Sequence, residues 1–380
     1  MSTQSPPALQ PGNDLLGQQI AGATPGAVPP DTPHSKVTER YWYMGTLVPT
    51  GRDVFGAGFG YYPNKGIMDG YLGFTLDGVQ HVYTASRRIG DSPLEPHAGA
   101  LRITVQEPLR THRIQLLENG SGLSADLLFH GALQPNDEGD DVLIKRDKLI
   151  SSVRRFVQFG HYQGWIEVAG RKIDIHPEQC WGARDRSWGL RIEANTDETQ
   201  PPVTPFKPLL FVWACIQFKD FGIHFFLKET APGEVRFMVG DEAYPIGSGK
   251  PSRRITAIEH DLQWQTDPYS QHLSGGKFVL RFEDGSHRVI AFENLPGHFY
   301  LKAGLYGGLN GWAHGDDKGV LHTQYNQFDF KEPKVREKLR TLAEQVTRFH
   351  CDGAEGYGTI QSGVAEGYPM YQEVQSAPVM

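Results

Sequence analysis

Residues 70–85 read GYLGFTLDGVQHVYTA, with runs of apolar and aromatic residues on both sides of Leu76-Asp77-Gly78. An Asp-Gly pair between two such runs favours a tight β-turn, because both residues accept the backbone angles that hairpin turns need. The stretch therefore predicts an antiparallel hairpin. Working outward along the chain, we expect further hairpin turns at Asn119-Gly120, Ala169-Gly170 and Asp284-Gly285.

The composition also favours an antiparallel β protein. The 380 residues include 44 glycines and 26 prolines, which supply turns, and 39% of the chain is hydrophobic. Strand-length runs form two series, over 38–193 and 209–330, on either side of a Pro-rich connection at 194–208. The expected fold is all-β: two antiparallel barrels or sandwiches in tandem, each able to enclose a small ligand, with one C-terminal helix.

The two ends of the chain differ from this body. Residues 1–37 are rich in Pro, Gly, Gln and Ala and predict a flexible N-terminal arm or one that drapes over a surface. Residues 331–350 predict an amphipathic helix, with Pro333 suited to its first turn. Its apolar residues recur on one helical face: Val335, Leu339, Leu342 and Val346. Residues 351–380 form a tail that could close a sheet with a last strand or hang loose.

Charge and cysteine usage narrow the classes of partner. The net charge is -7 with no basic stripe, so no nucleic-acid partner is expected. No run approaches the ~20 apolar residues of a membrane span, and no signal peptide is recognisable, so we expect a cytoplasmic protein. Cys180, Cys215 and Cys351 form no CxxC pair and predict small buried side chains. The sequence leaves open whether the chain forms a homodimer.

Several kinds of chemistry lack their sequence signatures. No GxSxG motif occurs, and no cysteine has a recognisable catalytic context. The glycine-rich stretches 56–60 and 304–312 do not open a helix after a strand, so bulges and tight turns are expected there instead of phosphate loops. A metal site is the weaker alternative for five clustered residues: His298, His314, Asp316, Asp317 and His322. We expect a polar turn there, and no metal or other cofactor.

The stretch QCWGARDRSWGLR, residues 179–191, places one aspartate, Asp185, among cations and large aromatic rings. Its neighbours are Arg184, Arg186, Trp181 and Trp188. In a regular strand Asp185 faces one way and both arginines the other, although Gly182 and Gly189 permit a bulge that changes the register, so periodicity alone does not choose the face. Two interpretations stay open: Asp185 forms a buried ion pair with an arginine, or it points into an apolar cavity where desolvation raises its pKa for acid-base work. A neighbouring arginine would oppose that pKa shift.

The arrangement W-x-x-x-D-R-x-W-G, residues 181–189, resembles the signature of carotenoid hydratase-like proteins, an all-β family of paired lipocalin-like barrels. The similarity spans residues 38 to about 330, includes GLYGGLNGW at 304–312, and is closest to a subgroup whose members mostly lack an assigned reaction. The resemblance implies that Asp185 protonates an alkene before water adds, without metal or nucleotide. Relatives of the same architecture include catalysts of pericyclic ring closure.

We therefore expect a cofactor-independent lyase or hydratase that adds or eliminates water, or a similar fragment, on a bulky hydrophobic terpenoid or aromatic molecule. The catalytic candidates are Asp185, Arg184, His298 and His314. The substrate-binding candidates are Trp181, Arg186, Trp188, Trp165, Tyr300, Tyr306 and Trp312; further pocket candidates are His161, Tyr162, Trp213 and His224. A carrier of lipophilic molecules and a pericyclase-like shape catalyst are the alternatives.

Overall fold

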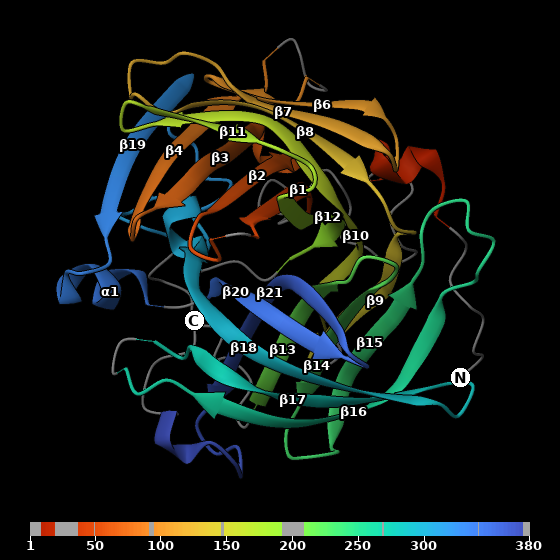
Figure 1. Ribbon diagram of the computed structural model, residues 1–380. Helices are drawn as coiled ribbons and strands as arrows, with labels where there is room; N and C mark the ends of the chain where they lie inside the picture. Colours follow the sequence, from red (N-terminus) through yellow and green to blue (C-terminus); the bar gives the residue numbers. More distant parts are fainter. Residues whose placement is uncertain are drawn as a thin grey trace.

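The computed structural model of the chain describes residues 9–19, 37–48, 50–90, 95–145, 148–191, 209–267, 270–340 and 342–374. Strands dominate these residues and form two assemblies, which Figure 1 shows one above the other. The upper assembly is an open 13-stranded sheet, and the lower one is a closed barrel. The expected all-β class is confirmed.

The first sheet contains the hairpin from which the sequence analysis began. β3 (Ile67–Leu76) and β4 (Val79–Arg88) pair in register, and Asp77 and Gly78 both adopt positive φ in the turn. The strands on the main path of the sheet are β19 (Leu321–Asp329), β4, β3, β2 (Val54–Tyr62), β1 (Val37–Leu47), β12 (Cys180–Leu190), β10 (Lys148–Val168), β8 (Ser124–Gly131), β7 (Thr111–Leu116), β6 (Leu101–Glu107) and β5 (His97–Ala98). β9 (Asn136–Lys145) and β11 (Arg171–Ile175) pair with the long β10.

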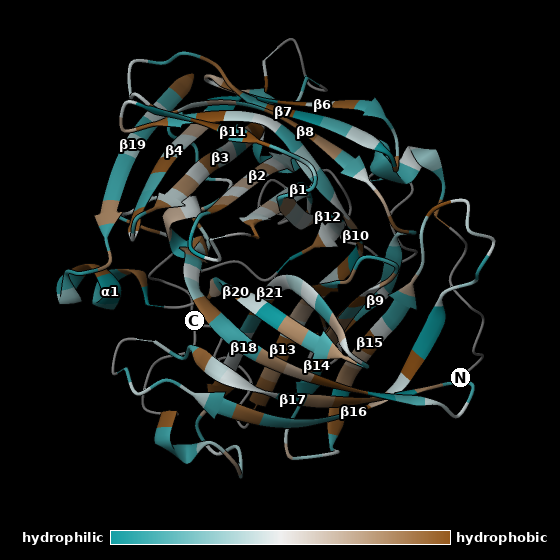
Figure 2. Cartoon of the chain, viewed as in Figure 1, coloured by the Kyte–Doolittle hydropathy of each residue, from teal (hydrophilic) through white to brown (hydrophobic). Residues whose placement is uncertain are grey.

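The barrel closes where its first and last strands, β13 and β21, pair along their length. Its strands are β13 (Leu209–Gln217), β14 (Gly222–Glu229), β15 (Val235–Ala243), β16 (Arg253–Trp264), β17 (Leu273–Phe282), β18 (His287–Tyr300), β20 (Ala343–Cys351) and β21 (Ala354–Ala365). Figure 2 shows polar and apolar residues alternating along such strands. The inward set includes Phe225, Phe278, Phe292 and Phe349, which fill the barrel core.

The chain crosses between the two assemblies more often than a tandem arrangement requires. After β18 it passes through the 3-10 helix η3 (Leu301–Gly304), gives β19 to the first sheet, forms α1 (Pro333–Leu339), and returns for β20 and β21. The expected second domain at 209–330 therefore misassigns β19 and omits two barrel strands. Two further short 3-10 helices are η2 (Pro63–Lys65) and η4 (Gln372–Val374).

The helix expected over 331–350 is wrong beyond Leu339. Residues 343–351 form β20, whose backbone pairs with β18 on one side and β21 on the other. The ladder satisfies more backbone groups across the barrel than a free helix would, and Phe349 turns into the core. The tail supplies β21, the closing strand. Within the described residues no helix combines the length and apolar character needed to cross a membrane.

The flexible arm expected over 1–37 is wrong for residues 9–19, which pack on the inner face of the first sheet. The short 3-10 helix η1 (Pro11–Asp14) ends in an aspartate whose side chain is fully buried. Gly17 N donates to Glu39 Oε2 at 2.9 Å and fastens the segment to β1. Residues 1–8 and 20–36, and the expected Pro-rich connection at 194–208, lie outside the described residues.

The outer face of the first sheet packs against the outer face of the barrel. Apolar side chains from both assemblies join one cluster, which includes Trp42, Val157 and Phe159 of the sheet and Trp213, Cys215 and Val346 of the barrel. Trp42 and Trp213 meet edge to face with ring centres 5.3 Å apart. This interface brings side chains of β12 close to those of the barrel.

Candidate functional site

Strand β12 lies between β1 and β10 in regular register, so its side chains alternate as expected. Asp185 pairs across the ladders with Trp42 and with Val157. Ala183, two residues away, joins the cluster between the assemblies, whereas Arg184 and Arg186 point to the inner face of the sheet. Asp185 therefore faces the barrel, away from both neighbouring arginines.

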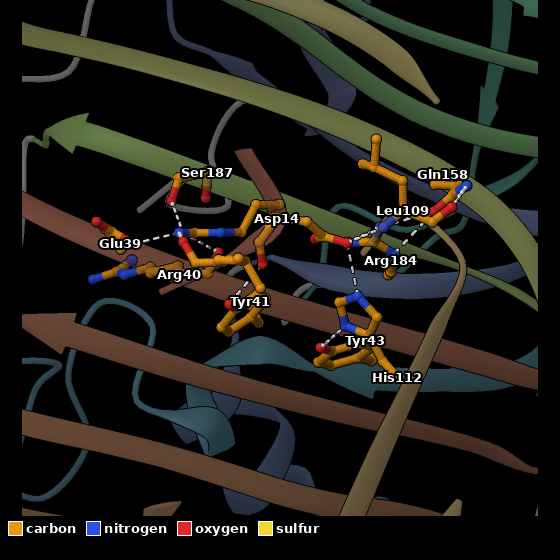
Figure 3. A network of polar contacts seen from close by, with 12 residues as sticks. Asp14, Glu39, Arg40, Tyr41, Tyr43, Leu109, His112, Gln158, Arg184 and Ser187 are labelled. Atoms are coloured by element: carbon orange, nitrogen blue, oxygen red, sulfur yellow. Dashed lines mark hydrogen bonds and ion pairs between the residues drawn. The ribbon is translucent and has the colours of Figure 1, made fainter. Parts of the chain in front are cut away.

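Arg184 is the centre of a buried network on the inner face (Figure 3). Its guanidinium contacts both carboxylate oxygens of Asp14, at 2.7 Å and 2.9 Å, and donates to Gln158 Oε1 at 2.8 Å. His112 Nε2 lies 2.9 Å from Asp14 Oδ2. Burial alone would raise the pKa of Asp14, but the charges of Arg184 and His112 hold it far below its usual range. Arg184 is thus committed to the N-terminal segment.

Arg186 and Trp188 fill the same inner face. Arg186 forms an ion pair with Glu39, donates to Leu15 O at 3.0 Å, and lies over the ring of Tyr41. Trp188 packs edge to face on Phe156, a neighbour on β10. The expectation of a hollow barrel interior behind the motif is wrong here, because large side chains occupy that space.

Asp185 combines an ion pair with a free oxygen. Its Oδ2 lies 3.1 Å from Arg155 Nε. Its Oδ1 is buried and has no hydrogen-bond partner in the part of the chain that the structure describes. Burial raises the pKa of Asp185 despite the opposing charges of Arg155 and Arg191. The side chain keeps 14% of its surface exposed.

Glu138 links this carboxylate to the barrel. Arg155 Nη1 donates to Glu138 Oε2 at 2.7 Å, and Trp213 Nε1 donates to Oε1 at 2.9 Å. His224 Nε2 also lies 2.9 Å from Oε1. Burial would raise the pKa of Glu138, but Arg155 and His224 lower it to about 2. Strands β9 and β10 of the sheet are thereby joined to β13 and β14 of the barrel.

The loop between η3 and β19 supplies two predicted site residues, Tyr306 and His314. The rings of Tyr306 and His314 meet edge to face at 5.0 Å, and Arg40 lies over Tyr306 at 5.6 Å. His314 Nδ1 lies 2.9 Å from Asp69 Oδ1, while its Nε2 has no partner among the described residues. Burial raises the pKa of Tyr306, and the nearby charge of Asp185 raises it further.

Glycines on β2 make room for aromatic rings on this face. A β-carbon on Gly58 would lie 2.4 Å from the Tyr71 ring, and one on Gly56 would lie 3.0 Å from Phe299. The stretch 56–60 was expected to form bulges and tight turns; it forms the regular strand β2 instead. Tyr71 is fully buried, and burial raises the pKa of its hydroxyl well above the usual value.

We call the resulting cluster between the two assemblies the inter-barrel site. It comprises Arg40, Tyr71, Arg155, Asp185, Arg191 and Tyr306, which are close enough for their charges to shift one another's pKa values. Four of its side chains are partly exposed: Arg155, Asp185, Arg191 and Tyr306. The fold therefore brings three predicted residues, Asp185, Tyr306 and His314, into one neighbourhood.

A narrow crevice lies beside this site between β12 and the barrel. It is lined by Met44, Phe159, Ala183, Cys215, Tyr357 and Thr359, and it is about the size of one water molecule. Glu344 of β20 lies in the same interface with its side chain fully buried. Gln361 donates to one carboxyl oxygen of Glu344, and burial raises the pKa of Glu344 to about 8.

The structure places three predicted tryptophans away from Asp185. Trp181 shares its face of β12 but packs against His161 and the barrel residue Tyr357. Trp165 stacks with Lys172 on the hairpin of β10 and β11. Trp312 meets His322 edge to face at 4.9 Å in the loop before β19.

His298 and Tyr300 belong to a separate aromatic cluster beside α1. His298 stacks on Phe330 at 4.4 Å and lies 5.1 Å from His272. Burial lowers the pKa of His298 to about 4, so this imidazole is neutral at pH 7. Tyr162, another pocket candidate, lies in the core of the first sheet and donates to Ala183 O at 2.9 Å.

The alternative of a metal site at residues 298–322 has no support in this arrangement. Asp317 pairs with Arg88 at 2.8 Å, and His314 pairs with Asp69. Among the described residues no group of three or more histidine, cysteine, aspartate or glutamate side chains could hold a metal ion. The three cysteines are free and buried, as expected.

Sequence reasoning missed most of the polar residues around Asp185. Arg155 lies in the run RRFVQFG, where alternation puts it and Val157 on one face of β10, so a charge among apolar neighbours was the available signal. Glu138 lies in an acidic run that is typical of an exposed turn. Arg191 ends the motif itself. Nothing in the order of the residues places them together, because they come from separate strands.

Comparisons with known proteins support the fold. No curated protein matches the chain. A solved structure of a protein described as AttH, from Nitrosomonas europaea, is 11% identical with a TM-score of 0.54, covering 89% of this chain and 98% of that one. Kievitone hydratase from Nectria haematococca is 11% identical with a TM-score of 0.40, covering 89% and 93%. CghA with Sch210972 is 12% identical with a TM-score of 0.46, covering 93% and 97%.

The likeness to the AttH structure supports the all-β fold, and it extends over nearly the whole of both chains. At 11% identity it shows the fold alone. A family model gives the sequence-level relationship, since it matches residues 22–367. The chain belongs to that family, DUF8625, a family of unknown function.

Proposed function

We propose that the chain is an enzyme, a cofactor-independent lyase or hydratase that works by general acid-base catalysis on a hydrophobic substrate at the inter-barrel site. The observation that carries the proposal is the state of Asp185. Its carboxyl group has a pKa raised by burial, a buried oxygen without a partner among the described residues, and a partly exposed side chain.

Adding or removing water needs one group that gives a proton and another that takes one. Protonated Asp185 donates its proton to an alkene carbon or to a leaving hydroxyl group. His314 is the candidate base, because Asp69 accepts from its Nδ1–H and leaves the lone pair on Nε2. Tyr306 is near both groups, since its ring meets His314 edge to face and the charge of Asp185 raises the pKa of its hydroxyl.

The surroundings suit a substrate with an apolar body. Trp42, Tyr71 and Trp213 supply aromatic surface at the interface, and the adjacent crevice has room for water. A larger substrate requires side chains of the interface to move apart, which distinguishes this site from a preformed pocket.

The test is a search for turnover. Panels of terpenoid and aromatic alkenes and alcohols are incubated with the protein and analysed by mass spectrometry for gain or loss of water. Asp185→Asn is expected to lower the rate by about 100-fold or more while keeping the fold. Asp317→Asn, at an exposed position, is the matched control and keeps the wild-type rate.

Three outcomes contradict the proposal. A folded Asp185→Asn protein with wild-type turnover removes Asp185 from the mechanism. Ligands that bind and return unchanged identify a carrier. Turnover that survives loss of both Asp185 and His314 but is lost on substitution of the aromatic residues identifies a shape catalyst.

A further inference from the structure

Arg191 differs from the other buried arginines around β12. Arg155, Arg184 and Arg186 each contact a carboxylate of the protein. The hydrogen bond of Arg191 in the described residues goes from Nη2 to the neutral hydroxyl of Ser187, and its Nε is buried without a partner. No carboxylate of the described residues forms an ion pair with Arg191, although its side chain is mostly covered.

The described carboxylates near Arg191 are paired with another arginine. Arg155 and Arg191 bring two guanidinium groups to the inter-barrel site, and the carboxylates of Asp185 and Glu138 both pair with Arg155. Burial, with the charges of Arg40 and Arg155, lowers the pKa of Arg191 to about 10. A desolvated cation among like charges costs free energy, so an anion at this position would be bound favourably.

The Glu138 carboxylate cannot supply that anion. Its two oxygens already accept from Arg155 and Trp213, and His224 contacts one of them. Asp185 gives one oxygen to Arg155, and the burial that raises its pKa disfavours its charged form. Among the described residues, no carboxylate therefore cancels the positive charge of Arg191.

We propose that Arg191 binds an anionic group of the substrate, so that the substrate is an aromatic or terpenoid acid whose carboxylate lies beside the carbon that Asp185 protonates. A planar guanidinium suits a carboxylate, because two N–H groups can donate to two oxygens. The arginines then also stabilise negative charge that develops on the carboxylate when a proton leaves the adjacent carbon. This inference rests on the proposed function for the reacting group, but its binding step is measured separately.

The experiment uses calorimetry with two probes of one shape, 2-naphthoate and its neutral counterpart 2-naphthalenemethanol. The wild-type chain is expected to bind the acid about ten-fold or more tightly than the alcohol. Arg191→Gln lowers the affinity for the acid to that of the alcohol and leaves the alcohol unchanged. Arg88→Gln, at an exposed ion pair, is the matched control and keeps the preference.

A second measurement guards against a misfolded variant. Because Arg191 lacks a carboxylate partner, Arg191→Gln without ligand is expected to melt at the same temperature as the wild type or higher. Arg191→Lys keeps the charge but loses the planar fork, and retains part of the preference.

Equal binding of acid and alcohol by the wild type, failure to bind either probe, or an Arg191→Gln protein that keeps the preference overturns the inference. The proposed function fails separately, when Asp185→Asn retains turnover. A chain that prefers the acid through Arg191 yet keeps its turnover without Asp185 would lose the proposed mechanism and keep the anion site.

Discussion

Asp14 and Arg184 are separated by 170 positions in the chain and meet as a two-point ion pair with both side chains fully buried. The carboxylate comes from the N-terminal segment and the guanidinium from the middle of the first sheet. Leu109 N and His112 also donate to or contact the carboxylate, at 2.5 Å and 2.9 Å. The segment is therefore part of the core of the sheet.

Asp14→Ala is expected to lower the free energy of unfolding by about 3–5 kcal/mol, because it leaves Arg184 as an uncompensated buried charge. Urea unfolding followed by tryptophan fluorescence measures the change. Asp261→Ala, which removes an exposed partner of Lys277 on a strand, is the control and changes stability by less than about 1 kcal/mol. Similar losses for the two variants would mean that the N-terminal segment does not carry the pair in solution.

Glu138 should make the free energy of unfolding decrease at acidic pH. Its folded-state pKa of about 2 is below that of an unfolded glutamate, so the unfolded chain binds more protons as the pH falls from about 5 towards 2. The stabilising contribution is complete above that window and is lost within it. Glu138→Gln is expected to flatten the acid limb of a melting-temperature profile. Glu107→Gln, at an exposed position, should leave it unchanged.

Glu344 predicts the opposite slope at higher pH. Its folded-state pKa of about 8 means that the folded chain holds a proton which the unfolded chain releases near pH 4–5. Stability therefore declines as the pH rises from about 5 to 8. Glu344→Gln should remove that decline and raise the free energy of unfolding at pH 8 by about 4–5 kcal/mol. A profile that matches the one for the exposed control Glu178→Gln would show that Glu344 is already ionised at neutral pH.

Gly58 tests how closely the aromatic rings pack on the outer face of the sheet. Gly58→Ala places a methyl group against the Tyr71 ring and should cost about 1–3 kcal/mol by overpacking. Tyr71→Leu in the same chain should recover part of that cost, because the clash is with the ring. Chemical unfolding of the two single variants and the double variant measures the coupling; additive losses would contradict it.

The sequence predicts strands and their turns well where local chemistry decides them. The Asp77-Gly78 turn needed only two residues that accept positive φ and apolar runs around them. The prediction of a helix for residues 343–351 is wrong, although Leu339, Leu342 and Val346 fit a helical period. The segment forms a strand because its backbone pairs with both β18 and β21 and closes the barrel. A barrel that must close overrides local periodicity.

The site was predicted only in part for a related reason. Alternation along β12 separated Asp185 from Arg184, but a strand buried on both faces carries no signal for which face meets the barrel. Arg155 and Glu138 reach Asp185 through strand pairing between distant segments. The burial of Asp14 could not be predicted from the N-terminal segment, because a single carboxylate among Pro, Gly and Gln does not change the hydrophobic pattern.

The position of β19 makes the first sheet and the barrel depend on each other. After β18 the chain adds β19 to the first sheet and then returns to the barrel as β20 and β21. No single cut of the chain can therefore separate the first sheet from the barrel with all strands of both intact. A fragment that ends after β12 would lack β19 and expose β4 as a sheet edge, and a fragment that begins at β13 would carry β19 without its partner. We therefore expect the two assemblies to melt together in one transition.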